Sequence, residues 1–521
     1  METSLVQSGS QLQVFVPICL IFTAVIMPII GRLAKRFREP IYLLATALSA
    51  AMAVVVFIKV FKSPVGYLEY FMGYGWQGLR VLKTGQPIGI VLKTDLFGAI
   101  LLLLINGIGV LAAFYSVPYI HHEVPASKHT YYYTLFLLML GGMSGIAITG
   151  DIFNFYVFFE IASISSYALV AISGKAESLE ATFKYLLVGA LSSIFIVFAI
   201  GLLFNATGTL NMQYASRQVA KIVTSHPDSF IYPFRYLIFA SLGLFIMGFS
   251  VKAALFPGHA WLADAHPVAP SSISALLSGL VIKATGIYPL VRFLFGIFAI
   301  HSGYYGRLIR PLFLTLAVIT MLGGSFFAIA QTKLKRMLAF STIAQVGYIM
   351  FGIGLITDFG VAGSILHIIN HAIVKGLLFL ISGIIIYKTG ITEIADMGKL
   401  GYKMPLTMTC FAIGACSMVG VPPLSGFMSK WILANAAFQA GLPFLIVFLL
   451  LSSLLNAVYY FRVVAISYFG IPKIDIDQTD EAPAMMQVPI VILAFLVVLI
   501  GILIKYPFHE VAMPASLMIF K

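Results

Sequence analysis

Apolar residues occur along this chain in long continuous runs that short polar turns separate. A helix needs about 20 such residues to cross a hydrocarbon core of about 30 Å. The strict alternation of barrel strands is missing from these runs. The pattern predicts an all-α integral membrane protein with about 14 transmembrane helices. We expect them at residues 14–30, 41–60, 95–118, 131–149, 152–173, 182–205, 232–256, 271–297, 311–330, 336–356, 361–387, 404–439, 443–469 and 486–505.

Prolines interrupt two of these predicted spans. Pro257 lies in KAALFPGHAW near the end of the seventh span, and Pro422 and Pro423 lie inside the twelfth. Proline lacks a backbone donor and interrupts a helix, so we expect spans seven and twelve to be broken. Broken helices at membrane depth are tolerated where protein or a water-filled cavity satisfies the freed backbone groups. The two breaks therefore predict an internal polar cavity.

Two similar offsets indicate an internal repeat. A shift of 178 residues places Lys252 on Lys430, and a shift of 181 places Tyr167 on Tyr348. We interpret residues 131–297 (spans four to eight) and 311–469 (spans nine to thirteen) as two five-helix repeats within a single membrane domain of residues 1–521. An odd number of helices gives the repeats opposite orientations in the membrane, which is the inverted arrangement of many transporters.

Composition restricts the chemistry further. The chain is 60% hydrophobic and 10% charged, against about 25% charged residues in soluble domains. Its net charge of +13 is better explained by anchoring to lipid headgroups than by a nucleic-acid partner. The three cysteines, all in apolar runs, have no metal or haem spacing, and nucleotide-binding loops are missing. We therefore expect no cofactor and no catalytic or redox site in the chain itself.

The residues that flank the predicted spans indicate how the chain is oriented in the membrane. The first run leads into GRLAKRFREP without a cleavage site, so we interpret it as a retained helix rather than a signal peptide. An even number of spans places both termini on one side. The compact basic turns RLAKRFR and QTKLKR fall on the other side, which favours termini outside the cell membrane, although the loops at 61–93 and 206–235 also carry basic residues.

Ionisable residues lie inside several central spans, where a charge is costly and a functional role is the default interpretation. These residues are Glu160, Lys252, Lys283, His367, His371, Lys375 and Lys430. The alternative is a set of static structural pairs. Buried ion pairs are at best neutral relative to apolar packing, so stability alone does not require so many of them.

Three of these residues, His367, His371 and Lys375, are spaced by four and share one helical face. Two histidines at this spacing could bind a metal, but no third ligand is evident, and the lysine would repel a divalent ion. A proton relay fits better, because imidazole titrates near neutral pH and a buried lysine can also exchange its proton. We expect no metal site.

Four stretches that carry these residues resemble a known family. They are GDIFNFYVFFEIASISSYALVA, SVKAALFPGHAWLADAHPVAPSSISALLSGLVIKATGIYPLVRF, HIINHAIVKGLLFLISG and MVGVPPLSGFMSKWIL. They resemble the antiporter-like subunits shared by Mrp-type cation/proton antiporters, respiratory complex I and membrane-bound hydrogenases. The resemblance extends from the third to the thirteenth span. It is closest to the D-type Mrp subunit and its counterpart in hydrogenase complexes.

This resemblance implies a row of ionisable residues across the membrane midplane. Glu160 on helix five would pair with Lys252 on helix seven as a switch, Lys283 would be the central lysine and Lys430 the terminal residue. The resemblance also places His367 and His371 at the polar positions of helix eleven, and Lys184, His259 and Lys375 are further candidates. One complex I member has glutamate where this chain has Lys430, which argues against that member. The chain ends about fifteen residues after the last predicted span, so we expect no lateral helix.

The implied function is proton translocation within a multisubunit ion-pumping complex of the hydrogenase or complex I type. Its partners would be other membrane subunits, a peripheral redox arm, and protons with or without sodium ions. The alternative is a D-type subunit of a sodium/proton antiporter without redox chemistry. A stand-alone secondary transporter is less favoured, because nothing indicates a site for an organic solute. A purely structural membrane spacer would leave the buried lysines without a role.

Overall fold

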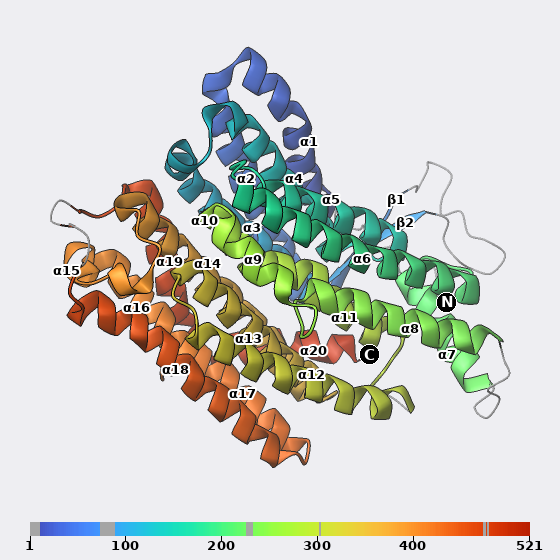
Figure 1. The fold of residues 1–521 in the computed structure, drawn as a ribbon. Helices are drawn as coiled ribbons and strands as arrows, with labels where there is room; N and C mark the ends of the chain where they lie inside the picture. Colours follow the sequence, from blue (N-terminus) through green and yellow to red (C-terminus); the bar gives the residue numbers. More distant parts are fainter. Residues whose placement is uncertain are drawn as a thin grey trace.

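The computed structural model describes residues 11–72, 89–225, 233–301, 304–472, 476 and 479–520. Helices account for most of these residues (Figure 1). The N-terminal elements are α1 (Leu12–Leu33), η1 (Lys35–Phe37), α2 (Arg38–Lys62), β1 (Tyr67–Met72), β2 (Ile90–Asp95) and α3 (Leu96–Glu123). The next are η2 (Ala126–Lys128), α4 (His129–Ile148), α5 (Ile152–Val170), α6 (Ala176–Thr207), α7 (Met212–Ser225), α8 (Pro233–Lys252) and α9 (Ala260–Val268).

The eighth span follows as a composite helix, and the second half of the chain continues the bundle. The composite consists of α10 (Ser271–Leu276), η3 (Leu277–Val281), η4 (Lys283–Ile287), α11 (Tyr288–Val291) and η5 (Arg292–Ile297). After it come α12 (Tyr304–Ile329), α13 (Leu334–Gly354), α14 (Asp358–Thr389), η6 (Ile394–Asp396), α15 (Leu400–Lys403), α16 (Pro405–Val419), α17 (Ser425–Gln439), η7 (Pro443–Leu445), α18 (Ile446–Phe469), α19 (Ala484–Ile502), η8 (Pro507–Ala512) and α20 (Met513–Ile519).

The integral membrane fold is confirmed. In the described part of the chain, thirteen helices are long and apolar enough to cross a membrane. The predicted span at 404–439 is not among them, because its central break divides it into the shorter helices α16 and α17. The predicted placement of the termini falls on residues 1–10 and 521, which lie outside the described residues.

Both predicted breaks are present. Helix α8 ends at Lys252, and α9 begins at Ala260 after a turn that contains Pro257. Helix α16 ends at Val419, and α17 begins at Ser425 after Pro422 and Pro423. Lys252 thus precedes its break, whereas Lys430 follows its own. The offset that superposes these two lysines does not also superpose the breaks, so the repeat boundaries stay a prediction.

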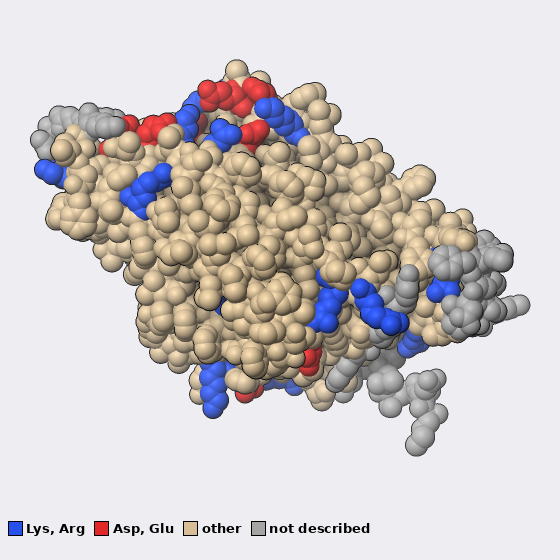
Figure 2. All heavy atoms as spheres, turned by 60° about the horizontal axis from the view of Figure 1, so that its bottom comes forward, with Lys and Arg blue, Asp and Glu red and all other residues tan. Residues whose placement is uncertain are grey.

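Helices α13 and α14 form the interior of the bundle and are buried over nearly their whole lengths. In Figure 1 the first helices and α17–α18 lie on opposite flanks, with α9 to α14 between them. The outer helices expose apolar side chains such as Phe22, Phe198 and Leu450. On the face shown in Figure 2, most charged side chains lie along two opposite edges, and the broad surface between them is largely uncharged. This surface is suited to contact with lipid tails.

Two elements were not predicted from the sequence. Strands β1 and β2 form an antiparallel pair in the register Tyr67↔Asp95, so the fold is not purely helical. Helix α7 lies in the region that we interpreted as a loop. Both lie outside the long apolar runs on which the span prediction rests.

Candidate ion-translocation site

The break after α8 holds Lys252 at the carboxyl end of that helix. Lys252 is 2% exposed. Its ammonium donates hydrogen bonds to Ser163 Oγ at 2.9 Å and to the Tyr167 hydroxyl at 2.6 Å. The same ammonium lies 4.7 Å from the centre of the Phe159 ring. All three contacts come from α5, so α5 positions this lysine.

The direct ion pair between Glu160 and Lys252 that we expected is not formed. The ion pairs among the described residues do not include one between them at 4 Å or less. Glu160 Oε1 is buried without a hydrogen-bond partner among these residues. Ser163 and Tyr167 follow Glu160 on the same face of α5, and the lysine reaches these hydroxyls instead.

Lys283 begins η4, a π-helical segment of the eighth span. The residue is 1% exposed, and its ammonium donates to the carbonyl oxygen of Ser278. Gly286, one turn further on, allows this span to approach the break after α8. A Cβ on this glycine would overlap the backbone nitrogen of Ala253. The glycine therefore brings the Lys283 segment close to the end of the Lys252 helix.

A hydrogen-bonded connection runs from the eighth span to α14 through α13. The Ser278 and Thr342 hydroxyls are 2.7 Å apart, and Thr342 donates to the carbonyl oxygen of Leu338 at 2.9 Å. Lys375 donates to the same carbonyl at 3.0 Å. These contacts place the groups that hold Lys283 and Lys375 in one polar network.

Lys375 is fully buried rather than extended toward a surface. In addition to the Leu338 carbonyl, its ammonium donates to Ser341 Oγ and to the Tyr460 hydroxyl, the latter at 3.1 Å. No carboxylate is among these partners. Among the described residues, hydroxyl and carbonyl oxygens are its hydrogen-bond partners, and its ammonium lies 5.8 Å from the centre of the Tyr460 ring.

A second network surrounds His367 and Lys430. His367 Nδ1 lies 2.9 Å from Ser429 Oγ, and its Nε2 lies 3.1 Å from Gln345 Oε1. Lys430 donates to the carbonyl oxygens of Met418 at 2.7 Å and Val419 at 3.2 Å. These carbonyls end α16, so the lysine satisfies acceptors that the helix break leaves free.

The two parts of the second network meet at Tyr348. Its hydroxyl is 3.1 Å from Ser453 Oγ, which in turn accepts a hydrogen bond from Lys430 at 3.0 Å. The ring of Tyr348 is centred 5.5 Å from the His367 ring. His367 and Lys430 are therefore linked by both polar and aromatic contacts.

His371 lies between the two networks. Its ring centre is 6.3 Å from that of His367, and Lys375 follows it by four residues on the same face of α14. It is fully buried, and neither ring nitrogen has a hydrogen-bond partner among the described residues. Buried polar groups are normally paired with protein or ordered water. Such a group between two networks is suited to pass a proton from one to the other.

Two further candidates lie away from this buried row. Lys184 has a half-exposed side chain that pairs with Glu180 at 2.8 Å and with Asp264 at 3.6 Å, so it lies outside the buried row. His259 lies in the turn after α8, partly buried, with its ring stacked on Phe256. It faces the break rather than the two networks.

Sequence reasoning missed two buried groups. His266 is fully buried, neither of its ring nitrogens has a partner among the described residues, and its ring packs on Phe379. Lys335 is 6% exposed, although we assigned it to the basic turn QTKLKR. His266 could have been found in the quoted stretch WLADAHPVAP. No feature of the sequence distinguishes Lys335 as buried, because Lys333 lies in the same basic turn only two positions away and is exposed.

Comparison with known proteins assigns the chain to a family. The family described as NADH:quinone oxidoreductase/Mrp antiporter, transmembrane region, matches residues 149–456. These residues contain both helix breaks and the whole buried row. The chain belongs to this family. Membership confirms the resemblance that the sequence motifs indicated.

Members of the NADH:quinone oxidoreductase/Mrp antiporter family of both types are similar to this chain over most of its length. NADH-quinone oxidoreductase subunit N from Desulforudis audaxviator is 34% identical, over 93% of this chain and 95% of that protein. The D-type subunit of the Na(+)/H(+) antiporter from Alkalihalophilus pseudofirmus is 33% identical, over 81% and 83%. A chain of the membrane-bound sulfane sulfur reductase, an archaeal respiratory membrane complex, superposes with a TM-score of 0.86 at 30% identity, over 98% of both chains.

Proposed function

We propose that this chain translocates protons within a multisubunit ion-pumping membrane complex of the complex I or hydrogenase type. The path follows the buried row from Glu160 and Lys252 through Lys283, His371 and His367 to Lys430, with Lys375 as a side member. The observation that carries the proposal is the position of His371, which lies without a hydrogen-bond partner among the described residues, one helical turn from His367 on one side and from Lys375 on the other.

The chemistry of the row supports proton exchange. Lys252, Lys283, Lys375 and Lys430 are held by hydroxyl and carbonyl oxygens rather than by carboxylates. A lysine without a fixed counter-charge can release its proton when a neighbouring charge changes, because no ion pair has to be broken. Protonation at one position then disfavours a charge at the next. We infer that this coupling moves the proton along the row.

The remaining features of the proposal concern the assembly. We infer that other membrane subunits are partners, since similar chains occur in an archaeal respiratory membrane complex and in a Na(+)/H(+) antiporter. A peripheral redox arm would supply the driving reaction. We place the complex in the cell membrane with both termini outside, in keeping with the basic turns.

A D-type subunit of a sodium/proton antiporter is the second candidate. The similarity to the D-type chain of the Na(+)/H(+) antiporter, which is nearly equal to that of the subunit N relative, favours it. In this case the same row would exchange protons against sodium, and no electron donor would be needed.

One experiment on the purified intact complex tests both candidates. The complex is reconstituted into sealed vesicles with a pH-sensitive dye, and proton movement is followed first with an electron donor and then with a sodium gradient. A response to the electron donor supports the first candidate, and a response to sodium alone supports the second. If proton movement persists unchanged when His371 is replaced by leucine, the proposed path is wrong.

A further inference from the structure

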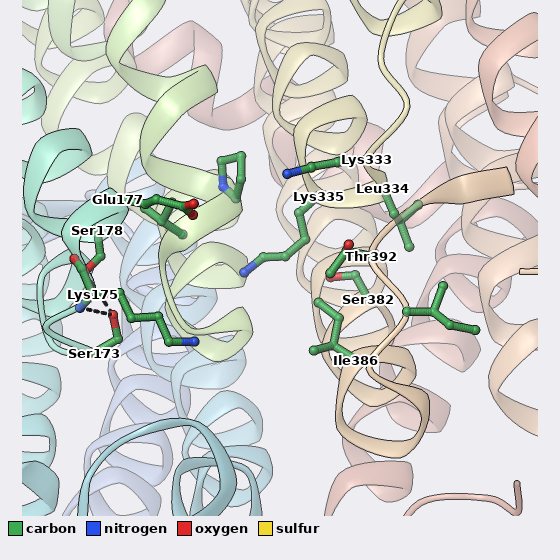
Figure 3. Close-up of a pocket in the computed structure, with 13 residues that line it drawn as sticks. Ser173, Lys175, Glu177, Ser178, Lys333, Leu334, Lys335, Ser382, Ile386 and Thr392 are labelled. Atoms are coloured by element: carbon green, nitrogen blue, oxygen red, sulfur yellow. Dashed lines mark hydrogen bonds between the residues drawn. The ribbon is translucent and has the colours of Figure 1, made fainter. Parts of the chain in front are cut away.

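A cavity of about 230 Å³ lies at one end of the bundle, away from the buried row. Its walls come from both halves of the chain: the turn before α6 and the start of α6, the end of α9, the start of α13, and the end of α14 with the turn that follows (Figure 3). The membrane spans Ala176–Thr207 and Leu334–Gly354 begin here, and Asp358–Thr389 ends here. The cavity therefore lies at the level of the lipid headgroups.

Three lysines line this cavity, namely Lys175, Lys333 and Lys335. Lys175 and Lys335 extend toward the same space from opposite walls (Figure 3). Lys335 is 6% exposed, and its ammonium donates to the carbonyl oxygen of Ala269. Among the described residues, no carboxylate lies within 4 Å of any of the three ammonium groups. Glu177 is the one acid among the lining residues, so the cavity has an excess of positive charge.

The helices that begin at the cavity add to this positive potential. The N-cap residue of α6 is Lys175 and that of α13 is Lys333, and neither makes a side-chain capping hydrogen bond. The first N–H groups of a helix lack intrahelical acceptors, and the helix dipole is positive at this end. Acceptors such as Asp or Ser are preferred there. The Leu334 N–H at the start of α13 donates to the carbonyl oxygen of Thr392 at 3.0 Å. Neither N-cap lysine offers an acceptor to the other N–H groups of the first turns, so an anion would stabilise both helix starts.

We propose that this cavity binds an oxyanion of the phosphate type. Helix starts and cationic side chains are the usual components of phosphate sites. Lys335 would provide the buried end of the site, Lys175 and Lys333 its rim, and the hydroxyl of Thr392 a further polar contact. The phosphate can belong to an anionic lipid headgroup or be free inorganic phosphate. A bound anion would join the α6 start to the α13 start and so hold the two halves of the chain together.

The test uses the purified intact complex in lipid nanodiscs. Thermal unfolding is compared between phosphatidylcholine alone, phosphatidylcholine with phosphatidylglycerol, and phosphatidylcholine with added inorganic phosphate. Native mass spectrometry counts the retained phosphatidylglycerol molecules. The double variant Lys175→Gln/Lys333→Gln removes the rim charges. The variant Lys62→Gln/Lys505→Gln is the matched control, since it removes two exposed lysines elsewhere.

Stabilisation by phosphatidylglycerol that the control retains and the rim variant loses supports a lipid headgroup site. The same pattern with inorganic phosphate supports a free phosphate site. We expect the rim variant to bind at least roughly tenfold more weakly, which corresponds to about 1.4 kcal/mol. Glu177→Gln should strengthen binding, because it removes the carboxylate that faces the same space. Equal responses of the parent complex and the rim variant, or no response to either phosphate source, would overturn the proposal.

Discussion

Lys430 donates a hydrogen bond to the carbonyl oxygen of Met418 across the break in the twelfth span, at 2.7 Å. The lysine therefore has two separable tasks: it satisfies the end of α16, and in the proposed path it exchanges a proton. Glutamine can still donate to the carbonyl but carries no exchangeable charge. Methionine can do neither.

The first prediction separates these tasks. Lys430→Gln should lower proton movement by roughly tenfold or more, equivalent to about 1.4 kcal/mol in the barrier, while the complex assembles normally. Lys430→Met should lose transport to the same degree and also lower thermal stability, since an unsatisfied buried carbonyl costs about 1–3 kcal/mol. Dye-monitored proton movement and thermal unfolding provide the two readouts. Normal transport in Lys430→Gln would leave this lysine with only a structural role.

The second prediction concerns the histidine between the networks. His371→Leu removes a buried group whose ring nitrogens have no partner among the described residues. We expect unchanged or higher thermal stability, by up to about 1 kcal/mol, together with a loss of proton movement. His367→Leu is the matched control: it removes the partner of Gln345 Oε1 and one of the two partners of Ser429 Oγ, so its stability should fall. A less stable His371→Leu complex that still transports would contradict the assigned role.

The third prediction tests whether Glu160 and Lys252 act as one unit despite the missing ion pair. Glu160→Gln and Lys252→Gln should each reduce transport strongly, and the double variant should be no worse than the more impaired single variant, because effects within one network do not add. The exposed pair Glu180 and Lys184 is the control, and its double glutamine variant should transport normally. The rate of proton movement is measured for each of these variants and for the parent complex. Additive losses at Glu160 and Lys252 would mean that they act independently.

The fourth prediction tests the contact between the eighth span and the break after α8. A methyl group at Gly286 would collide with the Ala253 backbone, so Gly286→Ala should cost about 1–3 kcal/mol of stability and reduce transport. Gly243→Ala is the control, because no atom lies within 4 Å of a Cβ at that glycine of α8. Thermal unfolding and proton movement are measured for both. Equal behaviour of the two variants would show that the close approach is unimportant.

Much of this arrangement could be predicted from the sequence because its causes are local. Apolar run length gave the spans, and Pro257 and Pro422 marked the breaks. The environment of single side chains could not be predicted in this way. Lys184 and Lys335 both lie near the start of a span, yet one is half-exposed and the other buried, because neighbouring helices decide which face is covered. Likewise, the rotation of α5 and the reach of Lys252 direct its ammonium to Ser163 and Tyr167 rather than to Glu160.

The π-helical turns around Lys283 have a mechanical consequence. A π turn is closed by a hydrogen bond from residue i to i+5 and holds one residue more than an α turn. If such a bulge shifts along the helix by one position, the residue that it passes rotates by about 100° about the helix axis. Both ends of the span can stay in place while this happens. A local rewinding of the eighth span would therefore rotate Lys283 about the helix axis, away from the Ser278 carbonyl that it contacts in this structure.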